Sequence, residues 1–113
     1  MSHVSDVIDR QVAAYNRRDV EAFAARYALG ADVYGPDGKI LAAGRDQIRR
    51  HYGTLFEQRP ELRPEIRNRI EVGSTVIDEE SVTGFTPDDT SVVRAAVVYR
   101  VAEGLILEAR LYL

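Results

Sequence analysis

The sequence of 113 residues has no cysteine, no tryptophan and a single lysine, Lys39. The absence of cysteine excludes disulfides, thiolate metal sites and cysteine nucleophiles. No apolar run approaches the roughly 20 residues that a membrane-spanning helix needs. Residues 1–6 also lack the basic and long apolar regions of a secretory signal. These absences favour a cytoplasmic protein with no membrane partner.

Charge and motif content exclude further classes of function. The net charge is −3, and basic side chains are interspersed with acidic ones instead of forming a stripe, so no nucleic-acid partner is expected. The chain has no glycine-rich phosphate loop, no nucleotide-binding fingerprint and no Ser-His-Asp set. We therefore expect no cofactor. The length suits a single domain with one hydrophobic core, spanning residues 1–113.

Apolar residues at helical spacing predict a first helix near the N-terminus. Ser2 or Ser5 is suited to cap it, because a short hydroxyl side chain can accept a hydrogen bond from an amide of the first turn. Gln11 lies on the apolar face of this helix, and residues 16–18 end it. The apolar positions are Val4, Ile8, Val12 and Tyr15.

Two more helices are predicted before residue 60. Asp19 is placed to cap the second helix, which ends at Gly30 and has an apolar stripe that includes Tyr27. The third follows Gly44 and ends before Pro60, since proline lacks the amide donor that a helix interior needs. Its buried stripe is formed by Ile48, Tyr52, Leu55 and Phe56, with His51 at the border.

The remaining segments are predicted to be β-strands. A Gly-Pro-Asp-Gly turn at residues 35–38 separates two short strands, because proline fixes φ and glycine tolerates positive φ. After residue 65 the apolar period changes to two, which is typical of half-buried strands. Tight turns then separate three successive hairpins, so the fold class is α+β with helices on one face of the sheet. The predicted strands are residues 31–34, 39–42, 65–72, 75–84, 90–102 and 105–112.

Two of these strands have informative faces. Asn68 shares one face of strand 65–72 with Ile66 and Ile70, while strand 90–102 is apolar on both faces. Because soluble domains seldom expose a broad apolar patch, the outer face predicts a homodimer packed sheet to sheet. A monomer with scattered apolar surface residues is the alternative. The inner face carries Val93, Ala95, Val97 and Tyr99, and the outer face carries Val92, Ala96, Val98 and, on the next strand, Ile106.

Several stretches of the chain carry a family resemblance: residues 13–16 (Ala-Ala-Tyr-Asn) with Asp19, residues 23–27, residues 44–52 and the alternating strand 76–84. Together they resemble the nuclear transport factor 2-like superfamily, and within it the ketosteroid isomerase and SnoaL-like branch. The resemblance covers nearly the whole chain. It implies a cystatin-like cone, with three N-terminal helices packed on a strongly curved, mainly antiparallel sheet. Because the matching residues cap and pack, they specify the fold better than an activity.

The resemblance also implies positions for catalytic groups, and three of them lack the expected side chain. Ketosteroid isomerase moves a proton with a carboxylate base and holds the oxyanion with a tyrosine and a protonated aspartate. By the resemblance these groups would fall at Gly35, Gln11 and Val97, which disfavours steroid isomerisation by that mechanism. Relatives similar to limonene-epoxide hydrolase need an Asp-Arg-Asp set. Arg110 lies near one of those acid positions and Val97 has no acid neighbour, so that reaction is also disfavoured.

Asp78 and Glu80 are the main candidates for acid–base chemistry. They are two residues apart on one strand, so their side chains project from the same face. If that face is concave, Glu80 enters the pocket, where desolvation raises the pKa of its carboxyl and suits it to act as a general base. In the alternative arrangement Ile77 faces the core and both carboxylates face solvent.

Other polar side chains complete the predicted site. His51 either carries a proton, because imidazole titrates near neutral pH, or forms a local hydrogen bond on the helix flank. Without a clustered partner it predicts no metal site. Tyr27 and Tyr52 match tyrosines that support the oxyanion donor in isomerase relatives, or else they only pack; Gln11 and Asn68 are either ligand donors or polar groups satisfied within the fold. The candidate catalytic residues are thus Glu80 and His51, and the candidate ligand contacts are Gln11, Tyr27, Tyr52, Asn68, Asp78 and Val97.

The pattern as a whole predicts a pocket for a small apolar ligand with one or two polar groups. If the pocket is catalytic, it performs proton transfer of the isomerase type, with Glu80 or His51 as base and Gln11 and Tyr52 as donors. The alternative is a non-catalytic module for dimerisation or ligand binding; in a dimerisation scaffold, side chains would fill the cavity. The two differ in whether a titratable group lies within hydrogen-bond reach of an open cavity.

Overall fold

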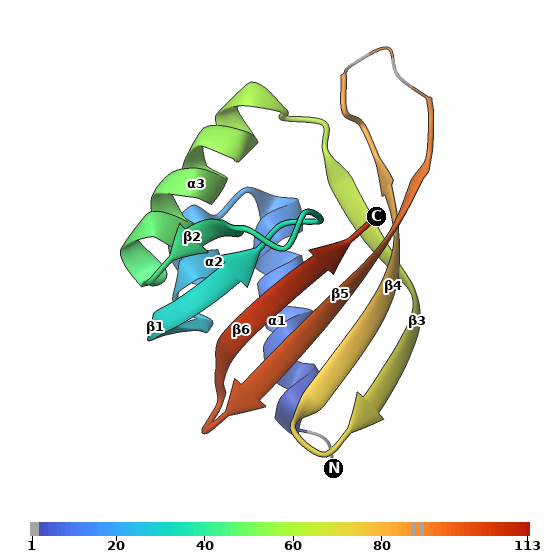
Figure 1. The fold of residues 1–113 in the computed structure, drawn as a ribbon. Helices are drawn as coiled ribbons and strands as arrows, with labels where there is room; N and C mark the ends of the chain where they lie inside the picture. The colour runs from blue at the N-terminus through green and yellow to red at the C-terminus, as the bar shows by residue number, and fades with distance from the viewer. Residues whose placement is uncertain (1–2, 87, 89) are drawn as a thin grey trace.

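The computed structural model describes residues 3–86, 88 and 90–113, and within them it contains three helices and six strands (Figure 1). The helices are α1 (His3–Arg17), α2 (Val20–Ala24) and α3 (Arg45–Gln58). The strands are β1 (Tyr27–Tyr34), β2 (Ile40–Ala43), β3 (Arg63–Val72), β4 (Thr75–Thr83), β5 (Val93–Ala102) and β6 (Leu105–Tyr112). No helix in this part of the chain is long and apolar enough to cross a membrane.

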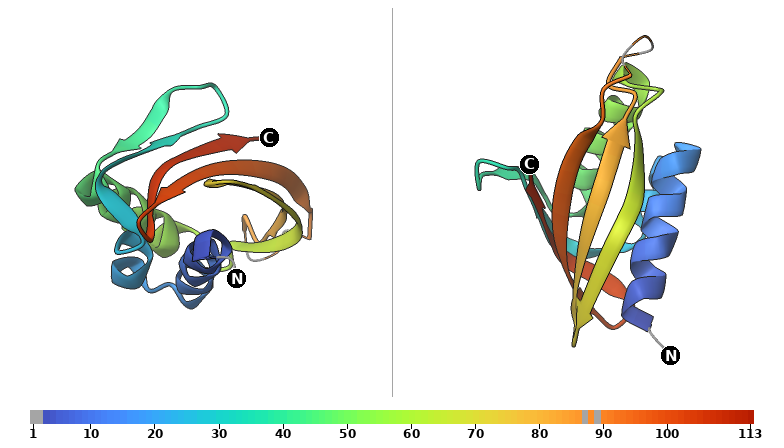
Figure 2. Two further views of the ribbon diagram at one scale, coloured as in Figure 1. Left: turned by 90° about the horizontal axis from the view of Figure 1, so that it is seen from below. Right: turned by 90° about the vertical axis from the view of Figure 1, so that its right-hand side faces the viewer.

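One curved sheet contains all six strands in the order β2-β1-β6-β5-β4-β3. Strands β1 and β6 run parallel, and every other neighbouring pair is antiparallel. The helices lie on the concave side of the sheet (Figure 2), where α1 contacts β3, β4, β5 and β6. This arrangement confirms the predicted α+β cone. The most buried large side chains between helices and sheet include Ile8, Phe23, Tyr27, Ile48, Val76 and Ile106.

The junction between α1 and α2 follows from local hydrogen bonding. Asp19 caps α2 as predicted, because its carboxylate accepts a hydrogen bond from the amide of Ala22 at 3.1 Å. Arg18, between the two helices, has a φ of 62°, in the left-handed region that a helix cannot contain. The chain therefore turns sharply after α1.

The start of α1 differs from the prediction. The helix already begins at His3, so Ser5 lies inside it and does not cap it. The Ser5 hydroxyl donates instead to a carboxylate oxygen of Glu71 on β3, at 2.8 Å, and so ties the helix to the sheet. The other predicted cap, Ser2, lies outside the described residues.

The second helix is shorter than predicted. It ends at Ala24, and β1 begins at Tyr27. Tyr27 is therefore a strand residue and not part of a helical stripe. The reason is tertiary: β1 lies between β2 and β6, and the backbone hydrogen bonds of this pairing outweigh the helical spacing in residues 25–30.

A β-bulge reverses the face of half of β3, and this overturns the prediction for Asn68. Ile66 pairs with Glu80, but Asn68 pairs with the neighbouring Glu79, so β3 contains one extra residue. Beyond the bulge Asn68 is exposed on the convex face, and Arg69 turns to the concave side. Strict alternation cannot predict such an insertion, since a shift of one residue exchanges the two faces.

A second irregularity, in β6, overturns the prediction for Ile106. The register of β5 against β6 shifts between Arg100 and Val101. Ile106 consequently faces the concave side, where it is fully buried and its amide donates to the carbonyl of Arg26 at 2.8 Å. It belongs to the core and adds nothing to the outer apolar face.

The convex face of β5 keeps part of the apolar character predicted from the sequence. Ala96 and Val98 are half-buried there, whereas Val92 precedes the strand and is exposed. An ion pair between Arg94 and Glu79 flanks them. Packing of this face against a second copy of the chain stays a prediction.

The replacement Val98→Glu tests the predicted dimer. If two copies pack through this face, the variant should sediment as a monomer, because the interface would otherwise bury unpaired charges. Leu29→Glu, at an exposed position of β1, is the matched control and should leave the association state unchanged. A dimer that persists in the Val98 variant would locate the interface elsewhere.

Candidate functional site

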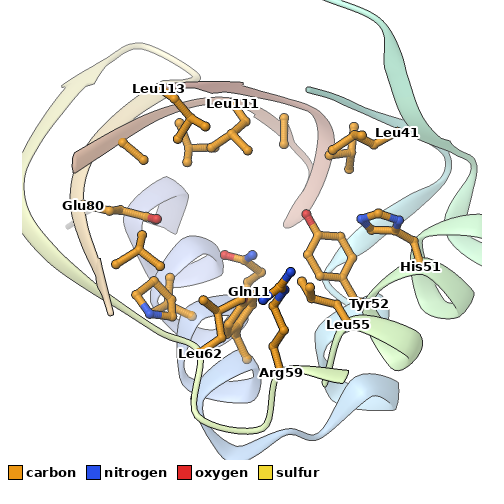
Figure 3. A pocket seen from close by; sticks show the side chains of 18 of the residues that line it. Gln11, Leu41, His51, Tyr52, Leu55, Arg59, Leu62, Glu80, Leu111 and Leu113 are labelled. Atoms are coloured by element: carbon orange, nitrogen blue, oxygen red, sulfur yellow. The ribbon is translucent and has the colours of Figure 1, made fainter. Parts of the chain in front are cut away.

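A cavity of about 260 Å³ lies between the concave face of the sheet and the helices (Figure 3). Its volume is slightly below the ~300–1,000 Å³ of pockets for drug-sized ligands, so it suits a smaller molecule. Most of the wall is formed by valine, leucine and alanine side chains. The polar lining residues are Gln11, Tyr15, Tyr27, His51, Tyr52, Arg59, Glu80 and Tyr99.

Glu80 enters this cavity from β4 (Figure 3). It shares the concave face with Val76, and only 7% of its surface is exposed. Ile77 projects from the opposite face, so the structure has the arrangement in which the carboxylate enters the pocket. Among the described residues, none donates a hydrogen bond to this carboxylate.

The environment of Glu80 shifts its titration towards neutral pH. Burial is the main cause, and the pKa of the carboxyl is raised to about 7. The like charge of Asp78 raises this pKa further, while the guanidinium of Arg69 lowers it. Near pH 7 both protonation states are therefore populated, as a general acid–base group requires.

An ion-pair network behind the cavity holds Asp78. Both carboxylate oxygens accept hydrogen bonds from Arg69, with Nε–Oδ1 at 2.6 Å and Nη2–Oδ2 at 2.9 Å; Nη1 of Arg69 reaches Asp9 on α1 at 2.7 Å. The hydrogen bond to Asp78 is the main cause that raises the pKa of Arg69. Asp78 has no exposed surface and does not line the cavity. Contrary to the prediction, it lies behind the site and not in it.

Gln11 links two tyrosine hydroxyls in the cavity wall. Its Nε2 donates to the hydroxyl of Tyr27 at 3.3 Å, and the hydroxyl of Tyr99 donates to its Oε1 at 3.5 Å. Burial is the main cause that raises the pKa of both tyrosines well above the usual value. The sequence predicts Gln11 and Tyr27 as lining residues but not Tyr99. The signal for Tyr99 is its position on the inner face of its strand, two residues after Val97.

Helix α3 contributes His51 and Tyr52 to the wall of the cavity. The Tyr52 hydroxyl points into the cavity (Figure 3), and its ring packs on Phe23 with centroids 4.5 Å apart. Burial raises the pKa of Tyr52, so its hydroxyl remains a hydrogen-bond donor. The His51 ring lies edge-on to Tyr52 at 5.0 Å, and burial lowers the pKa of this imidazole, which keeps it neutral near pH 7.

The rim of the cavity contains two residues that the sequence does not predict as part of a site, Arg59 and Phe85. Nη1 of Arg59 donates to the carbonyl of Phe85 at 2.7 Å and so links the end of α3 to the segment after β4. Gly84, with a φ of 80°, lets the backbone after β4 lie against the backbone at Glu61. A Cβ at residue 84 would be only 1.9 Å from the carbonyl oxygen of Glu61. Arg59 is one of many exposed arginines, and no sequence signal separates it from the others.

The remaining predicted contacts occupy different positions. Val97 lines the cavity as part of its apolar wall. Asn68 lies outside the cavity, on the exposed part of β3, where its Oδ1 accepts a hydrogen bond from the amide of Arg69 at 3.1 Å. Within the described ranges, no group of three or more histidine, aspartate or glutamate side chains is arranged to bind a metal ion.

Three helices on the concave side of a six-stranded sheet, around a largely apolar cavity that contains a few polar groups, define the nuclear transport factor 2-like cone, also called the cystatin-like fold. Within that class the chain belongs to the SnoaL-like family, whose domain model matches residues 8–109. No match was found among curated proteins.

Three solved structures illustrate the similarity. A cystatin-fold protein from Novosphingobium aromaticivorans is 21% identical, with a TM-score of 0.88, and the match covers 100% of this chain and 99% of that one. A protein with a ketosteroid isomerase-like fold from Catenulispora acidiphila, in complex with trimethylamine, is 17% identical, with a TM-score of 0.83 and coverages of 95% and 84%. A candidate polyketide cyclase from Sinorhizobium meliloti is 18% identical, with a TM-score of 0.82 and coverages of 98% and 99%. At these identities the similarity shows the fold alone.

Proposed function

We propose that the protein binds a small, largely apolar molecule in the cavity and that Glu80 exchanges a proton with it, in chemistry of the isomerase type. One observation carries the proposal: a carboxyl with a pKa of about 7, without a hydrogen-bond donor among the described residues, faces an open cavity. A buried carboxylate without a partner is costly. A ligand that offers a proton to Glu80 removes that cost.

Tyr52 is the second group in the proposed chemistry. Its hydroxyl enters the cavity from α3 and is suited to donate a hydrogen bond to a polar atom of the ligand. Gln11 is a weaker candidate, because one of its amide hydrogens is already bonded to Tyr27. His51 has the role of a neutral group near the rim that hydrogen-bonds the ligand or passes a proton to solvent.

The similar proteins support a small ligand. The Catenulispora acidiphila protein is in complex with trimethylamine, and the Sinorhizobium meliloti protein is described as a candidate polyketide cyclase. The alternative of a scaffold with a filled cavity is disfavoured by the open volume of about 260 Å³.

Deuterium exchange at carbon tests the proposed function without knowledge of the product. Two one-ring probes with an exchangeable methyl group, neutral acetophenone and the cation 1,2-dimethylpyridinium, are incubated with the protein in D₂O near neutral pH. The wild-type protein should accelerate deuterium uptake into at least one of them, as measured by NMR. Glu80→Gln should lose at least about 100-fold of that acceleration, because a general base contributes about 10²–10⁴-fold.

Glu79→Gln, which removes a carboxylate from the convex face of the same strand, is the matched control and should exchange as the wild type does. Equal rates in the wild-type and Glu80→Gln proteins would remove Glu80 from the mechanism. No acceleration of either probe by the wild-type protein would contradict the proton-transfer proposal itself.

A further inference from the structure

We propose that the ligand of this cavity is a small organic cation, an ammonium or iminium ion with an apolar body. The inference rests on the proposed function, because it concerns the same carboxylate, and it adds the charge of the ligand. It follows from three features of the described residues: the balance of fixed charges, the scarcity of donors for a negative charge, and the place of the lone lysine.

The fixed charges behind the cavity leave Glu80 without a counter-ion. The charge of Asp78 is matched by Arg69, which also binds Asp9, so this network has no positive charge to spare. Glu80 itself forms no ion pair with any described residue. When Glu80 is ionised, the cavity contains a buried negative charge that the protein does not neutralise.

Arg59 is the single permanent cation among the described lining residues, and its position makes it a poor counter-ion. It is exposed at the rim and bonded to the carbonyl of Phe85. Water and salt screen an exposed charge over about 10 Å, whereas a buried charge is screened much less. Among the charged groups of the described lining, Glu80 is therefore the one that lies inside the cavity.

The charge of Glu80 also affects the pKa values of the tyrosines that line the cavity. Burial is the main cause that raises the pKa of each, and the charge of Glu80 raises it further in every case; at Tyr15 the positive charge of Arg18 acts in the opposite direction and more strongly than Glu80. A ligand that already carries a negative charge would meet the same repulsion as long as Glu80 is ionised. These tyrosines are Tyr15, Tyr27, Tyr52 and Tyr99.

Apart from the tyrosine hydroxyls, the cavity offers few donors that could hold an oxyanion. The two remaining polar lining groups of the inner wall are Gln11, whose amide is already bonded to Tyr27 and Tyr99, and the neutral His51. Val97 supplies no donor. A positively charged ligand needs no oxyanion donor and gains from the unpaired carboxylate.

Proton transfer from a cation also removes charge from the cavity. When Glu80 takes the proton from the carbon next to an iminium C=N bond, the C–H electron pair forms a C=C bond and the C=N π pair returns to nitrogen. The ligand changes from +1 to 0 and Glu80 from −1 to 0. The same step on a ketone would move the negative charge from Glu80 to the ligand, in a cavity whose described inner lining has no counter-ion for it, and a low dielectric makes an unpaired charge costly. If the iminium carries a second C=C bond between its β and γ carbons, the proton can return to the γ carbon, and this completes an isomerisation.

The nitrogen of the cation has to belong to the ligand. Lys39 is the only lysine of the chain. It is exposed on the turn between β1 and β2 and does not line the cavity, so it is not placed to form an iminium with a bound carbonyl compound.

Three probes of one ring size test the charge of the ligand: cyclohexylammonium, cyclohexanol and cyclohexanecarboxylate. Their affinities are measured by calorimetry at pH 6 and pH 8. Cyclohexylammonium should bind most tightly, and its affinity should rise about tenfold between these pH values, because the ionised fraction of a carboxyl with a pKa of about 7 rises about tenfold. Cyclohexanol should bind more weakly, without this rise.

Other groups near Glu80 contribute little to that pH dependence. Asp78 and Arg69 are paired, the tyrosine hydroxyls titrate far above pH 8, and the pKa of His51 is lowered. In Glu80→Gln the affinity for cyclohexylammonium should fall to that of cyclohexanol and lose its pH dependence. Glu79→Gln should retain both the preference and the pH dependence.

Two results would overturn the inference. Cyclohexanol binding as tightly as cyclohexylammonium at pH 8 would show that the cavity does not distinguish charge. Tightest binding of cyclohexanecarboxylate, lost in Arg59→Gln, would show that the rim guanidinium selects an anion.

Glu80-dependent exchange of acetophenone, with no preference for the cation, would leave the proposed proton transfer intact and remove only the ligand class. Selective binding of cyclohexylammonium, with no deuterium exchange into acetophenone or 1,2-dimethylpyridinium, would support the ligand class and remove the proposed proton transfer.

Discussion

Replacing Glu80 with glutamine is expected to stabilise the protein at pH 8 by about 3 kcal/mol, while it removes proton transfer. The pKa of the Glu80 carboxyl rises from 4.5 in a model compound to about 7 in the folded protein. Each unit of difference between folded and unfolded states corresponds to about 1.4 kcal/mol. Glutamine keeps the shape of the side chain and carries no charge to desolvate.

The sign of this effect follows from proton binding. Between pH 4.5 and about 7 the folded protein binds more protons at Glu80 than the unfolded chain does. The stabilising contribution of this group is therefore fully present below pH 4.5 and is lost as the pH rises through about 7. Above that pH the folded state carries the full cost of a buried carboxylate.

Urea unfolding at pH 5 and pH 8 measures this difference. The wild-type protein should lose stability between the two pH values relative to Glu80→Gln, and the gap should be largest at pH 8. Glu79→Gln controls for the loss of one negative charge on the same strand. If both variants follow the wild-type pH dependence, Glu80 does not titrate near neutral pH and the proposed function loses its main support.

Replacing Arg69 with methionine is expected to cost about 3–5 kcal/mol of stability, because it leaves the buried carboxylate of Asp78 without a partner. The double replacement Arg69→Met with Asp78→Leu should recover most of that loss, since no unpaired charge then remains. The expected coupling between the two positions is thus large. It is obtained from urea unfolding of the two single variants and the double variant.

A surface ion pair of the same sheet provides the comparison. Arg94 and Glu79 pair across β5 and β4, with 78% and 38% of their side chains exposed. Arg94→Met should cost no more than about 1 kcal/mol, because water screens the pair. If Arg69→Met costs no more than Arg94→Met, the network behind the cavity does not hold Asp78 in the way that the geometry indicates.

Local chemistry in the sequence determined the class of the fold. The spacing of apolar residues predicts three helices followed by a mainly antiparallel sheet, and Asp19 caps α2 as its short carboxylate suggests. Alternation along residues 75–83 also predicts that Asp78 and Glu80 share a face. These features depend on neighbours in the chain, so periodicity and capping rules suffice to predict them.

The sequence by itself could not decide which side chains meet in the cavity. Tyr27 became a strand residue through pairing of β1 with β6, and the bulge in β3 exchanged Asn68 for Arg69 on the concave side. Pairing between strands distant in the sequence sets both outcomes, and a shift of one residue reverses a face. The titration of Glu80 near neutral pH likewise depends on burial and on the charge of Asp78 held by Arg69. Sequence determined the fold class and the carboxylate pair, whereas the tertiary structure decided that one carboxylate is paired and the other faces an open cavity.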